Sequence, residues 1–142
     1  MVSIMLRHYF PEWNKWLDGL PDPRRKEFCT YSIRHLVMLG FTMFLFQSGS
    51  RRQLRGDRQA LVFLSNFLEL TGTSEKTVAD PDTMNYLFER MDPSGLESVV
   101  VNACRTLIRS KCLDQFRLDG SVTIGFDATE LFRSNQQHCE KC

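Results

Sequence analysis

An eleven-residue apolar run, "LVMLGFTMFLF" at residues 36–46, restricts the folds open to this chain more than any other segment. It lies within "TYSIRHLVMLGFTMFLFQ" (residues 30–47), which has apolar side chains on most sides of a helix and is followed by "SGS". Because crossing a bilayer takes about 20 apolar residues, the run is too short for a membrane span. It predicts a buried helix in the middle of a domain.

Size and thiol content point to one reduced, cytoplasmic domain. The chain has 142 residues, of which 42% are hydrophobic, enough to form an ordinary core. Its five cysteines are an odd number, and its start, "MVSIMLRHYFPEWNKW", lacks the apolar stretch and cleavage site of a signal peptide. We therefore expect a cytoplasmic protein with free thiols and no membrane partner.

Helical patterns continue almost to the end of the chain. "RQALVFLSNFLEL" predicts a second apolar helix that stops at "TGTS". "DPDTMNYLFERM" predicts a short amphipathic helix that Asp82 caps, and "DPSGLESVVVNACRTLIRSKCL" predicts a longer one with Asp92 as its cap and Pro93 at its first position. The longer helix has apolar residues at helical spacing from Leu96 to Ile108. The expected fold is mainly α, with about five helices over residues 1–118.

The hydrophobic period changes at residue 121. Val122, Ile124 and Phe126 alternate with smaller or polar residues, which is the period of a β-strand. This strand delivers Asp127 to its end, and the following residues suffice for a hairpin, "TIGFDATEL" with "FRSNQQHC". A two-stranded ribbon is marginal unless it packs on something else.

Charge is segregated along the chain, although the net charge is only +1. Residues 31–60 carry five basic residues and one acidic residue, a balance of +4, whereas residues 61–100 carry two and seven, a balance of −5. Four of the basic residues form a cluster within "SRRQLRGDR": Arg51, Arg52, Arg55 and Arg58. This arginine cluster predicts a surface that contacts DNA phosphates. The alternative is a solvated helix start that pairs with the acidic segment.

Several segments follow one another in a telling order. "LPDPR" precedes the apolar helix, "GSRRQL" follows it, and "PDTMNYLFERMDPSGLE" leads through a long helix to the strand in "GFDATELFRS". This order resembles the amino-terminal half of bacterial insertion-sequence transposases of the DDE type, over residues 20–142. The resemblance implies that residues 119–142 begin an RNase H-like catalytic domain, so the fold class is a helical domain followed by an incomplete RNase H-like one.

The resemblance also implies a catalytic role for Asp127, as the first of three carboxylates. In the intact enzyme the three would hold two Mg²⁺ or Mn²⁺ ions about 3.5 to 4 Å apart, one at the attacking oxygen and one at the leaving oxygen. From the residues alone, the less favoured alternative is that Asp127 merely starts a turn after a strand.

The chain departs from the family pattern after Asp127. Ala128 stands where members of that family very often have glycine, and only Glu130 and Glu140 follow as further acids. The upstream acids fall at predicted loops and caps, where binding backbone N–H groups explains them. We therefore expect a truncated transposase that is inactive as an enzyme and binds no metal ion tightly.

The last residues also contain half of a zinc-site pattern. His138, Cys139 and Cys142 have suitable spacing, but the remaining ligands would have to come from cysteines on predicted helices, Cys29, Cys104 or Cys112. Free thiols are the favoured interpretation.

The expected function is that of a transposase fragment, from a lineage that cuts and joins DNA at insertion-sequence ends. It would bind those ends or partner subunits, either a second copy or the full-length transposase. Two alternatives stay open. One is a DNA-binding regulator that represses transposition, and the other is a helical protein-interaction domain without a nucleic-acid role.

Overall fold

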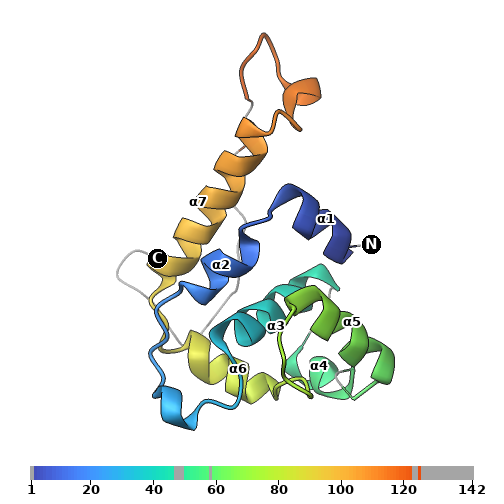
Figure 1. Cartoon of the computed structure of the whole chain (residues 1–142), viewed down its shortest axis with the longest axis vertical. Coiled ribbons are helices and arrows are strands. Elements are labelled where there is room, and N and C mark those ends of the chain that lie inside the picture. The colour runs from blue at the N-terminus through green and yellow to red at the C-terminus, as the bar shows by residue number, and fades with distance from the viewer. Residues whose placement is uncertain (1, 47–49, 58, 123–124, 126–142) are drawn as a thin grey trace, which may run out of the picture.

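A computed structural model describes residues 2–46, 50–57, 59–122 and 125, and this part of the chain is mainly helical. Figure 1 shows the helices gathered around α3, with α7 extending away from the others. The α-helices are α1 (Val2–Tyr9), α2 (Trp13–Asp18), α3 (Ile33–Leu45), α4 (Arg51–Asp57), α5 (Leu61–Thr71), α6 (Pro81–Phe88) and α7 (Pro93–Arg109). Two short 3-10 helices, η1 (Lys26–Phe28) and η2 (Asp114–Phe116), follow α2 and α7.

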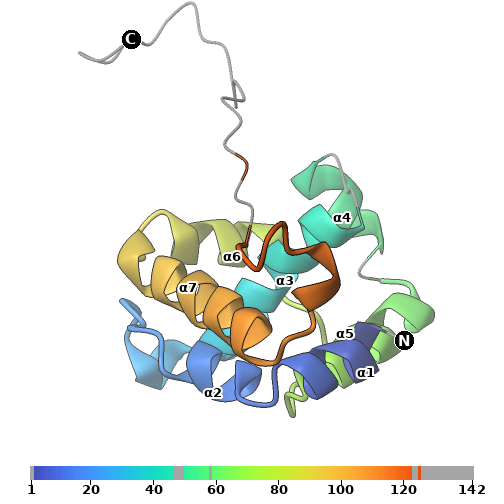
Figure 2. The ribbon, with the colours of Figure 1, turned by 90° about the horizontal axis from the view of Figure 1, so that it is seen from above.

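Helix α3 is the central element, as the apolar run predicts. It packs against α2, α5 and α6, and Figure 2 shows it behind α7 in the view from above. Its first turns are buried, and Leu36, Met38 and Leu39 have 0% exposure. Its carboxyl end is not enclosed, since Phe44 is 86% exposed. The expectation of a fully buried helix therefore holds only for the amino-terminal two thirds.

A glycine allows α3 and α6 to lie close together. A Cβ atom added at Gly40 would lie 2.7 Å from Cε2 of Phe88, closer than real Cβ contacts come. The ring of Phe88 therefore rests on the bare backbone of α3, and any larger residue at this position must push the two helices apart.

A buried histidine ties α3 to the segment before α6. The side chain of His35 is fully buried, and its Nε2 accepts a hydrogen bond from the Ala79 N–H at 3.1 Å. The carboxylate of Glu75 accepts from the N–H and the hydroxyl of Ser32, at 2.9 and 2.8 Å. Its other oxygen lies 3.8 Å from Nδ1 of His35. Ser32 is itself the N-cap of α3, so these contacts fix the helix start to the loop.

Both titratable groups of this pair have shifted pKa values. Burial of the imidazole lowers the pKa of His35, and the nearby carboxylate opposes that shift only in part. Burial alone would raise the pKa of Glu75, but hydrogen bonds from Ser32 and Thr73 outweigh it and lower this pKa to about 2. The pair therefore consists of a neutral imidazole beside a carboxylate at neutral pH.

The helix boundaries match the sequence signals except at α6. Helix α5 ends at Gly72, whose left-handed φ of 60° suits a glycine. Helix α7 begins with Asp92 as N-cap and Pro93 at its first position, as predicted. At α6 the N-cap is Asp80, which accepts from the Asp82 N–H at 3.0 Å. The assignment of Asp82 as cap is wrong, because Pro81 occupies the first helical position.

Helix α7 is only partly covered. Val99 is buried, but its neighbour Val100 is 60% exposed and Ile108 is also exposed. The apolar stripe read from the sequence thus forms a helix, yet α2 is its main neighbour. Beyond it, Leu118 and Ser121 form an isolated antiparallel bridge around Asp119 and Gly120, both with positive φ.

The strand predicted from residue 121 stays a prediction. No strand occurs within the described ranges, and residues 123–124 and 126–142, which include most of the proposed hairpin, lie outside them. In the described part of the chain, no helix has both the length and the hydropathy needed to cross a membrane.

Candidate nucleic-acid interface

The arginine cluster begins on α4, beside the start of α6. Leu54 is fully buried and anchors α4, which packs against α6. The cluster residues Arg51, Arg52 and Arg55 are exposed around this anchor, while Arg58 lies outside the described residues. Three of the four predicted DNA-contacting side chains therefore share one short helix on the surface.

Two of these arginines face carboxylates. The guanidinium of Arg55 donates to Asp80 at 3.0 Å and to Asp82 at 2.7 Å, and these hydrogen bonds raise the pKa of Arg55. Arg51 lies 3.7 Å from the carboxylate of Asp82. This is the pairing with the acidic segment that the alternative interpretation of the cluster expects.

The third arginine of α4 is differently placed. Arg52 is exposed, and no carboxylate among the described residues lies within ion-pair distance of it. It is one residue after Arg51 and therefore points about 100° away around the helix. Arg52 is thus the member of the cluster that is most available to a phosphate.

The sequence reasoning missed the role of Asp82. Asp82 lies at the start of α6, but its carboxylate does not cap that helix and instead accepts a hydrogen bond from Arg55 of α4. The signal was present, because a proline after Asp80 marks Asp80 as the N-cap and leaves the next acid free. The other upstream acid, Asp92, caps α7 through the Ser94 N–H at 3.0 Å, as expected.

The predicted metal ligands lie mostly outside the described residues. Asp127 does, and so do His138, Cys139 and Cys142. Within the described ranges, no three His, Cys, Asp or Glu side chains come close enough to hold a metal ion. Three cysteines are described, and all of them are free thiols: Cys29, Cys104 and Cys112.

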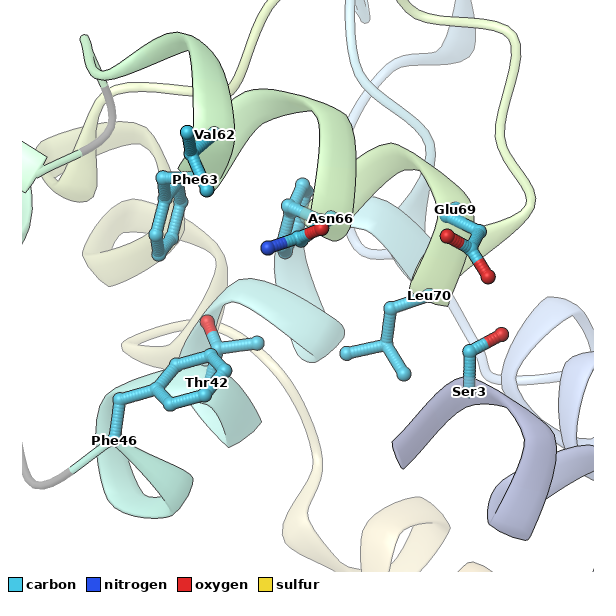
Figure 3. Close-up of a pocket in the computed structure, with 9 residues that line it drawn as sticks. Ser3, Thr42, Phe46, Val62, Phe63, Asn66, Glu69 and Leu70 are labelled. Carbon is cyan, nitrogen blue, oxygen red and sulfur yellow. The ribbon is translucent and has the colours of Figure 1, made fainter. Parts of the chain in front are cut away.

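An apolar pocket lies between α1, α3 and α5. It has a volume of about 450 Å³ and is lined mainly by Phe46, Val62, Phe63, Phe67 and Leu70. Figure 3 shows Thr42 and Phe46 on α3 below it, with α5 above and Ser3 of α1 at one side. Part of its apolar lining is open to solvent, since Val62 is 73% exposed and Phe46 is 56% exposed. The sequence signal for this pocket was that the predicted helices carry more apolar residues than one buried face requires.

Comparison with models of known protein families, with curated proteins and with solved structures finds no match to this chain.

Proposed function

We propose that this chain is the amino-terminal part of an insertion-sequence transposase of the DDE type, acting in the cytoplasm. It binds DNA at the element's ends or partner subunits. The 142 residues on their own do not cut DNA.

The contact between distant sequence segments carries this proposal. Two pairs of the segments on which the transposase resemblance rests are far apart in the sequence but adjacent in space, whereas "GFDATELFRS" lies almost entirely outside the described residues. "LPDPR" packs on the start of α7, where a Cβ at Gly95 would lie 3.1 Å from Leu20 Cδ2 and 3.3 Å from Pro21 Cδ. "GSRRQL" and the following arginine meet the start of "PDTMNYLFER" through the pairs of Arg55 with Asp80 and Asp82. Residues that resemble one family in order thus form one physical unit, which favours a shared origin over chance.

The ion pairs on α4 are compatible with DNA binding. The side chains of Arg51 and Arg55 are about half exposed, and that of Asp82 is 68% exposed. Exposed pairs of this kind stabilise a protein by only about 0 to 1 kcal/mol. A DNA phosphate can therefore replace a carboxylate as the partner of either arginine at small cost, while Arg52 needs no exchange.

Catalysis by this chain alone is not expected. In the proposed lineage Asp127 is the first catalytic carboxylate of an RNase H-like domain, and two Mg²⁺ or Mn²⁺ ions would require three such ligands. After Asp127 the 142 residues carry only Glu130 and Glu140. DNA binding without cleavage also fits a regulator that occupies element ends and blocks intact copies.

Fluorescence anisotropy with a labelled duplex of about 30 base pairs tests the proposal, in a series of salt concentrations. The wild-type chain should bind, and Arg52→Ala should reduce the slope of log affinity against log salt by about 1. Arg105→Ala, an exposed arginine on α7, is the matched control and should leave the slope unchanged.

Asp82→Asn should have the opposite effect and strengthen duplex binding. It frees Arg51 from its carboxylate and leaves Arg55 with Asp80 alone, so the duplex affinity should rise by roughly 2- to 5-fold. Glu97→Gln, on α7, removes an equal charge away from α4 and should have no such effect. A wild-type chain that binds no duplex at low salt would refute the DNA-binding role.

The apolar pocket favours a second candidate, a protein-interaction domain. Phe46 and Val62 expose apolar surface in the pocket between α1, α3 and α5, and such surface commonly marks a protein contact. The expected partner is a second copy of this chain. Sedimentation equilibrium should then show a dimer that Val62→Asp dissociates, with DNA binding by the monomer unchanged.

A further inference from the structure

A second basic surface lies where the segment at residues 23–31 meets α6 and is not formed by α4. The segment at residues 23–31 and the outer face of α6 form a groove of about 670 Å³. From α6 it is lined by Thr83 and Tyr86, which are three residues apart and so share one helix face, and from the turn after α6 it is lined by Arg90. From the segment it is lined by Arg25 and Phe28, among others.

The groove is positively charged. Three arginines and no carboxylate line it. Arg24 is neutralised by Asp22, at 2.6 Å, whereas no described carboxylate pairs with Arg25. Arg90 lies 3.6 Å from Glu89, in a pair whose side chains are both about half exposed and which is therefore weak. Two cations, Arg25 and Arg90, are thus available to an anion.

The groove also presents flat side chains to solvent. Phe28 is 81% exposed and Tyr86 is 48% exposed. The guanidinium of Arg90 lies 3.7 Å above the ring of Tyr86 and donates to the Tyr86 carbonyl at 3.2 Å. Arg90 is therefore held over the ring of Tyr86, with its other side available for stacking.

The segment at residues 23–31 is held in place by polar contacts. The buried guanidinium of Arg24 binds both oxygens of Asp22, at 2.9 and 2.6 Å, and donates to the Tyr31 carbonyl at 3.1 Å. The hydroxyl of Tyr31 is 2.9 Å from that of Thr77. The Arg24 bonds join the two ends of the segment to each other, and the Tyr31–Thr77 bond joins one end to the loop before α6, so Arg25 and Phe28 lie on a constrained segment.

We propose that this groove binds single-stranded nucleic acid, with bases stacked on Phe28, Tyr86 and the Arg90 guanidinium and with phosphates beside Arg25 and Arg90. Exposed rings next to the unpaired Arg25 and the weakly paired Arg90 suit unstacked bases, whose faces a duplex hides. An acidic protein segment would use the cations but leave the exposed rings without a role. The inference rests on the proposed nucleic-acid-binding role but concerns a different surface from α4.

The test uses the full chain and a fluorescein-labelled oligothymidylate of about 20 nucleotides, longer than the roughly 4 to 16 nucleotides that one small domain covers. Tyr86→Leu keeps an apolar helix residue and removes the ring, and it should weaken binding roughly 5- to 150-fold, the value of one stacked base. Arg25→Ala should reduce the salt slope by about 0.7. The duplex affinity of both variants should change by less than about 2-fold, because that surface is on α4.

Two matched controls separate stacking from general effects. Phe116→Ala removes an exposed ring from η2, and Arg109→Ala removes an exposed charge from α7. Both should bind the oligothymidylate as wild type does. Equal melting temperatures of all variants will show that the fold is intact.

The outcomes distinguish this inference from the proposed function. A wild-type chain that binds duplex but not oligothymidylate overturns the inference alone, as does unchanged oligothymidylate affinity in both groove variants. Equal losses for both nucleic acids, or binding of a polyglutamate peptide that the same substitutions abolish, also overturn it. Groove-dependent oligothymidylate binding without duplex binding supports the inference and refutes the assignment to element ends.

Discussion

Replacing Glu75 with alanine should lower the free energy of unfolding by about 2 to 4 kcal/mol. The carboxylate accepts two hydrogen bonds from Ser32, at 2.9 and 2.8 Å, and its side chain is only 13% exposed. Hydrogen bonds to a charged group contribute about 1.5 to 3 kcal/mol each. Because the Glu75 carboxylate stays partly exposed, the expected loss of stability is smaller than the sum of two such bonds. The loss also releases the start of α3 from the loop.

The effect of Glu75 has a defined pH dependence. Its pKa falls from 4.5 in the unfolded chain to about 2 in the folded protein, so folding favours the ionised form. The stability that this ionisation provides is fully present above pH 4.5 and is lost as pH falls through about 2. The stability difference between wild type and Glu75→Ala should therefore shrink steadily across this window.

Urea unfolding followed by far-ultraviolet circular dichroism measures both effects. Glu69→Ala is the matched control, because the Glu69 side chain is exposed on α5 and has no ion pair among the described residues. A double-mutant cycle with Ser32→Ala should give a coupling of at least about 1 kcal/mol. A Glu75→Ala variant within about 0.5 kcal/mol of wild type at pH 7, or a difference that does not change with pH, would refute this reasoning.

Three further predictions follow from particular residues. Because burial lowers the pKa of His35, the wild-type chain should lose stability as pH falls below about 6.5, by at most about 1.4 kcal/mol per pH unit. In urea unfolding, His35→Gln should flatten that part of the pH profile. Gly40→Ala should lower the melting temperature, since its Cβ would lie 2.7 Å from the Phe88 ring, whereas Gly56→Ala on α4, with nothing within 4 Å, should leave it unchanged or raise it. The chain should not nick duplex DNA in Mg²⁺ or Mn²⁺, and Asp127→Ala should not alter that result in a plasmid-relaxation assay, whereas cleavage that Asp127→Ala abolishes would contradict it.

The helices could be predicted where one short segment carries the signal. The apolar run of α3, the Gly72 stop of α5 and the Asp92–Pro93 start of α7 are local features, and the structure has all three. The N-cap of α6 could also have been predicted, because Pro81 at the first helical position identifies Asp80 as the cap. Side-chain periodicity and cap chemistry suffice there because both act within one or two turns.

The partners of surface side chains could not be predicted in the same way. Pairing of Arg55 with Asp82 depends on α4 lying beside α6, 27 residues later in the chain. The exposure of Val100 and Phe44 likewise depends on which helices pack nearby. The groove of Arg25 and Tyr86 has no contiguous signal at all, since it forms only when an irregular segment meets a helix face.

Selection of bound duplexes from a pool of random sequence tests the central claim most directly. The purified chain is mixed with the pool at moderate salt, and the DNA that it retains is sequenced after several rounds. The account predicts enrichment of one sequence, as expected for a domain that recognises the ends of an insertion element, and weaker retention of the same sequence by Arg52→Ala. A retained pool with the composition of the input, or no retained DNA, would contradict it.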